Sequence, residues 1–347
     1  MQPIAPPLLS WYEQNKRVLP FRILSTPYRV WVSEIMLQQT RVSAAVPYFE
    51  RFMAALPTVA DLASCPQEKL HKLWEGLGYY SRVRNLQKAA CIVMEEYGGQ
   101  LPADYDALLK LPGIGAYTAG AIASISFGLP VPAVDGNVLR VFARLLNDDR
   151  DVLSPAVKKD LTQTVMEHQP ALRPGDYNQA LMELGALICL PNGAPLCEHC
   201  PLKELCLAKA AGTAEALPKK VPTPEKKQQP QTLLLVISEG RVLLEQRPPK
   251  GLLAGLWQPL LLEGQHTPQE ALAHLESLGL AARFQGQLPN AKHVFTHLVW
   301  DMTLYLFSAQ ATPCLAGCVW ADKAAIEQEY TLPNAFKACK KELAQLL

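Results

Sequence analysis

The stretch that decides the fold is LLKLPGIGAYTAGAIAS, which runs from Leu108 to Ser124. Pro112, Gly113 and Gly115 interrupt two runs in which apolar residues recur at helical spacing. Glycines permit a tight turn, and the N–H groups at the start of the second helix can bind an anion such as a DNA phosphate. The stretch therefore predicts a helical hairpin that docks on DNA independently of base sequence, although a turn of this kind can also be purely structural.

Downstream, VPAVDGNVLRVFARLL places Asp135 immediately before an amphipathic helix. An aspartate in that place is first of all an N-cap, which stabilises a helix by ~1 kcal/mol. Capping does not exclude catalysis, because a carboxylate held by helix N–H groups stays ionised and can face a developing cation. Asp135 is therefore a candidate for both roles.

Further along, four cysteines follow one another with gaps of seven, two and five residues: Cys189, Cys197, Cys200 and Cys206. Four thiolates in so short a loop can close on one metal centre, either zinc or an iron–sulfur cluster, and the spacing alone does not choose between them. The remaining cysteines are scattered among apolar neighbours and are interpreted as small buried hydrophobes: Cys65, Cys91, Cys314, Cys318 and Cys339.

These motifs lie in a chain whose pattern is helical from Leu8 to about Leu207. The following stretch KKVPTPEKKQQPQ, Lys219–Gln231, is rich in Pro, Lys and Gln, as is typical of an exposed linker. We therefore predict a helical domain over residues 1–218, a linker over 219–231 and a second domain over 232–347.

The second domain changes to strand-like patterns. TLLLVI and RVLLEQR flank Ser-Glu-Gly, which predicts a β-hairpin, and HVFTHLVWDMTLYLF predicts one longer strand. PQEALAHLESLGL and AAIEQEYTLPNAFKACKKELAQLL have helical patterns. The chain is thus expected to combine an all-α domain with an α+β domain.

Composition limits the partners. The 347 residues are 49% hydrophobic and 19% charged, with a net charge of +1, so any DNA-binding patch must be local. No apolar run approaches the ~20 residues of a membrane span, and the first residues lack the pattern of an export signal. We expect a cytoplasmic protein, associated with the nucleoid through DNA and without membrane contact.

Taken together, LPGIG, VDGNV and the four cysteines resemble the helix-hairpin-helix DNA glycosylases of the endonuclease III superfamily. Within it, VWVSEIMLQQT and WEGLGYYSRVRNL resemble the MutY family of adenine glycosylases, and the resemblance covers nearly the whole chain. It implies a monomeric base excision repair hydrolase that flips adenine out of double-stranded DNA and removes it where it is mispaired with 8-oxoguanine or guanine. It also implies a [4Fe-4S] cluster on the four cysteines and a Nudix-like second domain.

Two carboxylates suit this chemistry. Cleavage of a glycosidic bond through an oxocarbenium-like transition state needs an acid for the leaving group and a carboxylate for the cation. The resemblance implies that Glu34, in SEIMLQQT, protonates adenine N7 and then positions water, and that Asp135 stabilises the cationic sugar. Without the surrounding motif, Glu34 is an ordinary solvated glutamate on a helix.

Relatives that also cut the strand carry a lysine two residues after the second glycine of the hairpin, because Schiff-base chemistry needs an amine. This chain has Tyr117 there, which predicts a monofunctional glycosylase with Tyr117 lining the pocket. The resemblance further implies that Asn137 helps to hold the water or the sugar.

A flipped base leaves a hole in the duplex that the protein must fill. Gln39 and Tyr79 match the family's wedge residues, and Arg22 and Glu183 match positions of the adenine pocket. Each residue also has an interpretation without a role in DNA binding: Tyr79 as a core residue, for example, and Arg22 as a surface charge. Phe21 stands where the family often has Trp, which still provides an aromatic wall.

The second domain resembles the Nudix fold but lacks the Arg-Glu-x-x-Glu-Glu run that holds Mg²⁺, so it is not expected to hydrolyse nucleotides. In the family, a Phe-Ser-His loop reads 8-oxoguanine, and this chain offers Phe295, Thr296 and His297. Thr keeps the hydroxyl and adds a methyl group. On alternation alone these residues would belong to the polar face of a strand.

Other functions stay open at this point. A thymine or uracil mismatch glycosylase shares the hairpin, a non-catalytic DNA-binding protein could use it too, and a nucleotide-pool hydrolase is a third alternative. The first cysteine gap is seven residues where six is usual in the family, which one extra loop residue absorbs.

Overall fold

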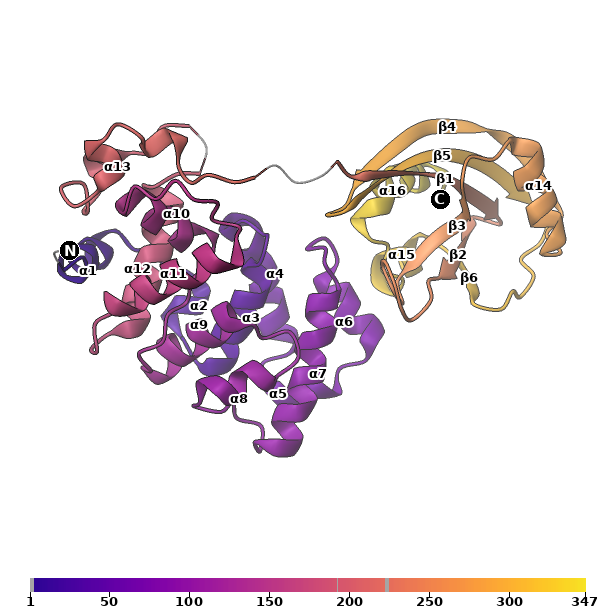
Figure 1. Cartoon of the computed structure of the whole chain (residues 1–347). Coiled ribbons are helices and arrows are strands. Elements are labelled where there is room, and N and C mark those ends of the chain that lie inside the picture. Colours follow the sequence, from indigo (N-terminus) through magenta and orange to yellow (C-terminus); the bar gives the residue numbers. More distant parts are fainter. Residues whose placement is uncertain (1–2, 192, 222–224) are drawn as a thin grey trace. The chain divides into compact units, whose positions relative to one another are not determined.

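The structure is a computed structural model that describes residues 3–191, 193–221 and 225–347. It divides into two compact units (Figure 1). The helical unit comprises Met1–Ser64 and Ser81–Thr223, and the sheet unit comprises Cys65–Tyr80 and Pro224–Leu347. Residues 65–80, which we predicted to belong with the N-terminal domain, thus group with the C-terminal part of the chain.

The helical unit is all-α within its described residues, as predicted. Its elements are α1 (Ala5–Asn15), α2 (Pro20–Ile23), α3 (Pro27–Leu37), α4 (Val42–Ala55), α5 (Val59–Ser64), α7 (Ser81–Glu96), α8 (Tyr105–Lys110), α9 (Ala116–Phe127), α10 (Gly136–Leu145), α11 (Pro155–Glu167), α12 (Pro174–Leu187), η1 (Cys197–His199), α13 (Leu207–Ala210) and η2 (Ala214–Ala216). α1, α10, α11 and α12 enclose one hydrophobic core. No helix within the described residues has both the length and the apolar character needed to cross a membrane.

The predicted hairpin is formed by α8 and α9. Gly113 has a φ of 79°, in the left-handed region, and a Cβ there would lie 2.8 Å from Asn85 Cβ. Gly115 is the N-cap of α9. α9 itself is buried over most of its length, and Gly120 lets it approach the chain so closely that a Cβ would lie 2.1 Å from the Pro132 carbonyl oxygen. The hairpin therefore packs against the segment that leads to Asp135.

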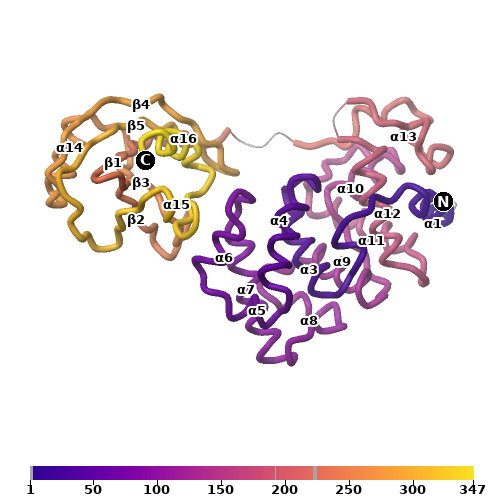
Figure 2. The backbone as a smooth tube through the Cα atoms, turned by 180° about the vertical axis from the view of Figure 1, so that it is seen from behind, coloured from indigo at the N-terminus to yellow at the C-terminus, as the bar shows by residue number. Residues whose placement is uncertain are grey.

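The sheet unit contains α6 (Gln67–Trp74) and a six-stranded mixed sheet in the order β4-β5-β1-β3-β2-β6. Its other elements are β1 (Lys227–Ser238), β2 (Arg241–Gln246), β3 (Trp257–Glu263), α14 (Pro268–Ser277), β4 (Ala282–Val294), β5 (Leu298–Ala309), β6 (Cys318–Ala321), α15 (Lys323–Gln328), η3 (Asn334–Phe336) and α16 (Lys337–Leu346). β1 pairs with β5 in parallel, and the remaining pairs are antiparallel. Residues of α14 and α16 join separate hydrophobic clusters with alternate residues of β1, so the two helices cover opposite faces of the sheet (Figure 2).

The predicted hairpin of β1 and β2 is confirmed. Its turn residues Glu239 and Gly240 have φ of 50° and 70°, the positive values that a two-residue hairpin turn requires. The helical patterns are also confirmed, although the last is broken into α15 and α16 around Pro333.

Two boundaries differ from the sequence-based expectation. β1 begins at Lys227, not after Gln231, because its first residues pair with β5 from Leu298 onward. Residues 222–224 of the predicted linker lie outside the described part of the chain. The single strand predicted for HVFTHLVWDMTLYLF is wrong: β4 ends at Val294, residues 295–297 turn, and β5 begins at Leu298, with Phe295 N–H donating to the Leu298 carbonyl at 2.8 Å.

Candidate active site

The helical unit contains a cavity of about 610 Å³, within the range of ligand pockets. Its lining includes all of the predicted catalytic residues, both predicted base-pocket residues and one predicted wedge residue: Glu34, Asp135, Tyr117 and Asn137, then Arg22 and Glu183, then Gln39. These side chains come from α2, α3, α9, α10 and α12 and from the loops beside them. Residues that are far apart in the sequence therefore meet around one space.

Glu34 enters the cavity from α3. This helix begins with Pro27 after the N-cap Thr26, and its residues Val30–Met36 are all buried, so the Glu34 carboxyl is surrounded by protein and only 6% exposed. Burial raises the pKa of Glu34 to about 7, against the opposing effect of a hydrogen bond from Tyr117. A carboxyl group with such a pKa is half protonated near neutral pH and can act as a general acid.

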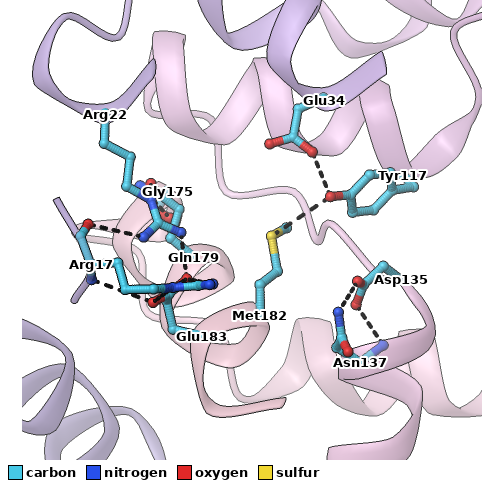
Figure 3. A network of polar contacts seen from close by, with 10 residues as sticks. All are labelled: Arg17, Arg22, Glu34, Tyr117, Asp135, Asn137, Gly175, Gln179, Met182 and Glu183. Carbon is cyan, nitrogen blue, oxygen red and sulfur yellow. Dashed lines mark hydrogen bonds and ion pairs between the residues drawn. The ribbon is translucent and has the colours of Figure 1, made fainter. Parts of the chain in front are cut away.

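Tyr117 projects from the first turn of α9, and its hydroxyl donates to Glu34 Oε2 at 2.5 Å (Figure 3). The same hydroxyl lies 3.7 Å from the Met182 sulfur. Burial, with the nearby Glu34 and Asp135, raises the pKa of Tyr117 well above its ordinary value. The phenol therefore remains neutral and serves as a hydrogen-bond donor to the acid.

Asp135 is the N-cap of α10, as predicted. Its Oδ1 accepts the backbone N–H groups of Asn137 at 2.9 Å and Val138 at 2.8 Å, and its Oδ2 accepts Asn137 Nδ2 at 2.6 Å. Burial raises the pKa of Asp135, and these three hydrogen bonds act in the opposite direction. The carboxylate is held rigidly on the cavity wall by donors that favour its charged form.

Sequence reasoning missed the residues that fix this wall. Asn178, fully buried on α12, accepts Ala133 N–H and donates to the Val131 carbonyl at 2.9 Å, which pins the segment before Asp135. Arg140 donates to Asn137 Oδ1 at 2.8 Å and to the Cys189 carbonyl at 2.7 Å. The Asn137 side chain is thus tied to the segment that begins the cysteine loop.

Glu183 lies on the opposite part of the lining, 1% exposed, between two arginines (Figure 3). Arg22 Nη2 contacts Glu183 Oε1 at 3.0 Å. Arg17, which the sequence did not single out, contacts the same oxygen at 2.5 Å through Nη2 and Oε2 at 2.9 Å through Nε. Burial works to raise the pKa of Glu183, but the two arginines hold it below its ordinary value. Gln179 accepts Arg22 Nε at 3.1 Å and completes the group.

Gln39 lines the cavity immediately after α3, with a left-handed φ of 58°. Its neighbour Gln38 donates to Thr118 Oγ1 at 3.3 Å, and Arg82 Nη1 donates to the Gln38 carbonyl at 2.6 Å. These contacts fix the backbone on both sides of the end of α3. Gln39 is therefore held at the edge of the cavity in a conformation that a non-glycine residue adopts only under such constraint.

The second predicted wedge residue and the predicted lesion-reading residues lie in the sheet unit. Tyr79, in the loop after α6, is 49% exposed and so does not belong to a core. Its hydroxyl lies 3.3 Å from Thr296 Oγ1, in the turn between β4 and β5. Phe295 packs edge-on against Trp300 with ring centroids 4.9 Å apart, and His297 is exposed beside it. Tyr79, one of the two predicted wedge residues, is therefore a neighbour of the predicted lesion-reading turn.

The four predicted metal ligands, Cys189, Cys197, Cys200 and Cys206, line a second cavity of the helical unit. Arg144 Nη1 lies 3.1 Å from Cys189 Sγ. Burial raises the pKa of the Cys200 thiol to about 12. Among the described residues, no group of three or more Cys, His, Asp or Glu side chains has the arrangement needed to hold a metal ion.

The comparisons with known proteins agree with this architecture. Residues 32–167 match the family model of the HhH-GPD superfamily base excision DNA repair proteins, and residues 232–342 match that of the NUDIX domain. Solved structures with the same helical fold include a thermostable thymine-DNA glycosylase, 27% identical with a TM-score of 0.53, covering 59% of this chain and 94% of the other. A non-covalent endonuclease III–DNA complex is 26% identical with a TM-score of 0.50 and similar coverage, 59% and 94%.

Relatives that are similar over most of this chain include several proteins named adenine DNA glycosylase. The adenine DNA glycosylase of Mus musculus is 38% identical over 88% of this chain and 70% of its own length. Because the similarity extends through both matched domains and most of the relative, the chain belongs to the adenine DNA glycosylase family.

Proposed function

We propose that this adenine DNA glycosylase of base excision repair removes adenine mispaired with 8-oxoguanine or guanine in double-stranded DNA, with Glu34 as acid and Asp135 as the charge-stabilising carboxylate. One observation carries the catalytic part: a buried Glu34, with its pKa raised to about 7, lines the same cavity as Asp135. The solved endonuclease III neighbour in complex with DNA supports DNA as the partner. The proposed enzyme acts as a monomer on DNA in the cytoplasm.

In the proposed first step, protonated Glu34 gives its proton to N7 of the flipped adenine. The C1′–N9 bond then breaks, its electron pair leaves with the neutral adenine, and the sugar becomes an oxocarbenium ion. The carboxylate of Glu34 accepts a proton from the water that attacks C1′, which restores the acid and leaves an abasic site. Tyr117 holds the Glu34 carboxyl in place through its 2.5 Å hydrogen bond.

Asp135 faces the sugar cation in this scheme. Its three hydrogen bonds come from Asn137 and Val138, so both carboxylate oxygens are fixed before the cation forms. Fixed charge of this kind stabilises a transition state without reorganisation. Asn137 positions the carboxylate and, through its place in the lining, the water or sugar.

The adenine is recognised at Glu183. The carboxylate of Glu183 is kept ionised by Arg17 and Arg22, so it is an acceptor suited to the exocyclic amino group of adenine, while the guanidinium groups are donors suited to its ring nitrogens. A base with a carbonyl oxygen in place of the amino group would bring one hydrogen-bond acceptor against another, the Glu183 carboxylate, and no hydrogen bond could form. This arrangement supports adenine over thymine or uracil.

The chemistry is proposed to stop at the abasic site. Tyr117, at the place of the lysine of strand-cutting relatives, is a neutral phenol and cannot form a Schiff base. Borohydride should therefore trap no covalent DNA adduct that matters for turnover. An efficient, stoichiometric adduct would contradict monofunctional action.

The turn at residues 295–297 is proposed to read 8-oxoguanine. Phe295 anchors the turn on Trp300, and Lys226 Nζ donates to the Phe295 carbonyl at 2.8 Å. In this proposal the exposed Thr296 and His297 offer a hydroxyl and an imidazole to the N7–H and O6 edge of the lesion. Tyr79, whose hydroxyl contacts Thr296, and Gln39 fill the hole that the flipped base leaves.

The four cysteines are proposed to hold a [4Fe-4S] cluster. All four line one cavity, and four thiolates are the usual ligand set of such a cluster. When bound, the cluster supplies a covalent tie for the loop that carries its ligands. Residues Cys189 and Arg144 already connect this loop to α10.

Catalytic roles are tested by base release under single-turnover conditions. Glu34→Gln and Asp135→Asn should each abolish release of adenine while leaving binding to the mismatched duplex nearly unchanged. Glu50, an exposed glutamate on α4, provides the matched control Glu50→Gln. Appreciable base release by Glu34→Gln would remove that residue from the acid role, and normal activity of Asp135→Asn would leave Asp135 as a cap alone.

Lesion reading is tested separately with the duplex in which guanine replaces 8-oxoguanine. Each good hydrogen bond to a base is worth ~1–3 kcal/mol of discrimination. Thr296→Ala with His297→Ala should therefore lower the preference for A·8-oxoG over A·G while release from A·G persists. Full retention of the preference would assign lesion reading to the helical unit.

A further inference from the structure

The loop that carries Tyr79 has three positive φ angles, two at glycines, which adopt them readily, and one at Tyr79 itself, where it is unfavourable. Between Trp74, at the end of α6, and Ser81, Gly76 and Gly78 have φ of 105° and 71°, and Tyr79 itself has a φ of 48°. A bulky side chain in the left-handed region persists only where surrounding contacts impose that conformation. Contacts made at the start of the loop contribute to this constraint.

Glu75, the first residue of this loop, is at the centre of an ion-pair cluster. Its Oε2 lies 2.6 Å from Lys72 Nζ on α6, and its Oε1 pairs with Lys340 Nζ on α16. The Glu75 side chain is only 17% exposed, so solvent screens these pairs less than it would at an open surface. Lys72 Nζ also donates to the Ile326 carbonyl at 2.7 Å, at α15.

A second attachment follows immediately. Asn334, at the start of η3, donates from Nδ2 to the Gly76 carbonyl at 2.9 Å. Within the loop, Trp74 Nε1 donates to the Gly78 carbonyl at 3.0 Å, next to Tyr79. The base of the loop is therefore joined to α15, η3 and α16, which all lie after the Nudix-like strands in the sequence.

We propose that Lys340 and Asn334 brace the Tyr79 loop through Glu75 and Gly76, and that 8-oxoguanine preference depends on this brace. Lys340 is a positioning residue: it pairs with Glu75, at the start of the loop, and acts on Tyr79 through that pair. The inference rests on the proposed wedge role of Tyr79 and reading role of Thr296. It gives the C-terminal helices a function of their own, which is to support the Tyr79 loop.

Release of the brace should disturb the position of Tyr79 relative to Thr296 and leave the cleavage of the glycosidic bond largely unchanged. When the brace is released, Tyr79 samples other backbone conformations and its hydroxyl leaves Thr296, so both wedge insertion and lesion reading weaken. A part-exposed ion pair supports an effect of about two- to fivefold on the preference for A·8-oxoG over A·G. The single-turnover rate on A·8-oxoG at saturating enzyme should fall less than the apparent affinity.

The experiment uses the full-length protein with Lys340→Met, Glu75→Gln and the double variant. Lys341→Met is the matched control, because Lys341 is the next residue on α16 and is exposed. Wedge insertion is measured by the fluorescence of 2-aminopurine placed next to 8-oxoguanine in the duplex, and preference by base release from A·8-oxoG and A·G. Both single variants should reduce the fluorescence change and the preference. The double variant should be no worse than Glu75→Gln alone, because that single change already removes both ion pairs of Glu75. Lys341→Met should behave as the unaltered protein.

Charge reversal separates a brace from general destabilisation. Glu75→Lys alone should lose more than Glu75→Gln because it adds a third lysine to the cluster, and Lys340→Glu in the same chain should restore insertion and preference. A Lys340→Met variant that matches Lys341→Met, independent effects in the double variant, or no restoration on reversal would each overturn the brace. If Thr296→Ala keeps the full preference while Lys340→Met still reduces the fluorescence change, the lesion-reading proposal fails and the brace stands.

Discussion

Replacing Glu34 by glutamine should stabilise the free protein at alkaline pH even as it abolishes base release. The structure buries the Glu34 carboxyl almost completely and raises its pKa to about 7 from an ordinary 4.5. A buried acid with a raised pKa lowers the free energy of unfolding whenever the pH is high enough to ionise it. Glutamine removes the charge, keeps the shape and can still accept the Tyr117 hydroxyl.

The sign follows from the direction of the shift. Below pH 4.5 the carboxyl is protonated in both the folded and the unfolded chain, so it costs nothing. Between the two pKa values the unfolded chain releases the proton and the folded chain retains it, so stability falls as pH rises and levels off above about 7. At 1.36 kcal/mol for each pKa unit, the loss at pH 8.5 is on the order of 3 kcal/mol.

The assay is urea unfolding followed by far-ultraviolet circular dichroism, at pH 5.5 and pH 8.5, on the unaltered protein, Glu34→Gln and Glu50→Gln. The gain in unfolding free energy from Glu34→Gln should be larger at pH 8.5 than at pH 5.5 by on the order of 2 kcal/mol. Glu50→Gln should show no such difference. An equal effect of Glu34→Gln at both pH values, or a smaller gain at pH 8.5, would refute a raised pKa for Glu34.

Three further outcomes are expected. Tyr117→Phe removes the hydrogen bond that lowers the pKa of Glu34, so the alkaline limb of base release should move to higher pH by about one unit; a limb that stays or moves down contradicts this. Gly120→Ala places a Cβ 2.1 Å from the Pro132 carbonyl oxygen, so urea unfolding should show a loss of ~2 kcal/mol or more, and an unchanged midpoint would exclude that close approach. Protein purified anaerobically should be brown and contain roughly four irons per chain, and Cys200→Ser should lose them; stoichiometric zinc without visible absorbance would refute the cluster.

The sequence predicted best where local rules and the family motif agree. Asp135 before an amphipathic helix is an N-cap by local chemistry alone, and the structure confirms it. The hairpin at Gly113 follows from the need for a positive φ. Glu34 has no such local signal, because a glutamate on a helix is ordinarily solvated. Only the surrounding motif predicted its role as the acid.

Long-range pairing set the limit of the sequence analysis. Arg17 is 166 residues from Glu183, and nothing in KRVLPFR distinguishes it from a surface arginine. Asn178 is missed for the same reason, since its partners Ala133 and Val131 lie in another segment. The turn at 295–297 was hidden because alternation continues through it, and only the antiparallel register of β4 against β5 reveals the break.

The central claim is that one cavity removes adenine and that a separate turn recognises the base opposite. Single-turnover base release by the full-length protein on matched duplexes containing A·8-oxoG, A·G and T·G tests it most directly. We expect fast release of adenine from A·8-oxoG, slower release of adenine from A·G, and no release of thymine from T·G. Release of thymine at a rate comparable with adenine, or equal rates on A·8-oxoG and A·G, would contradict the account.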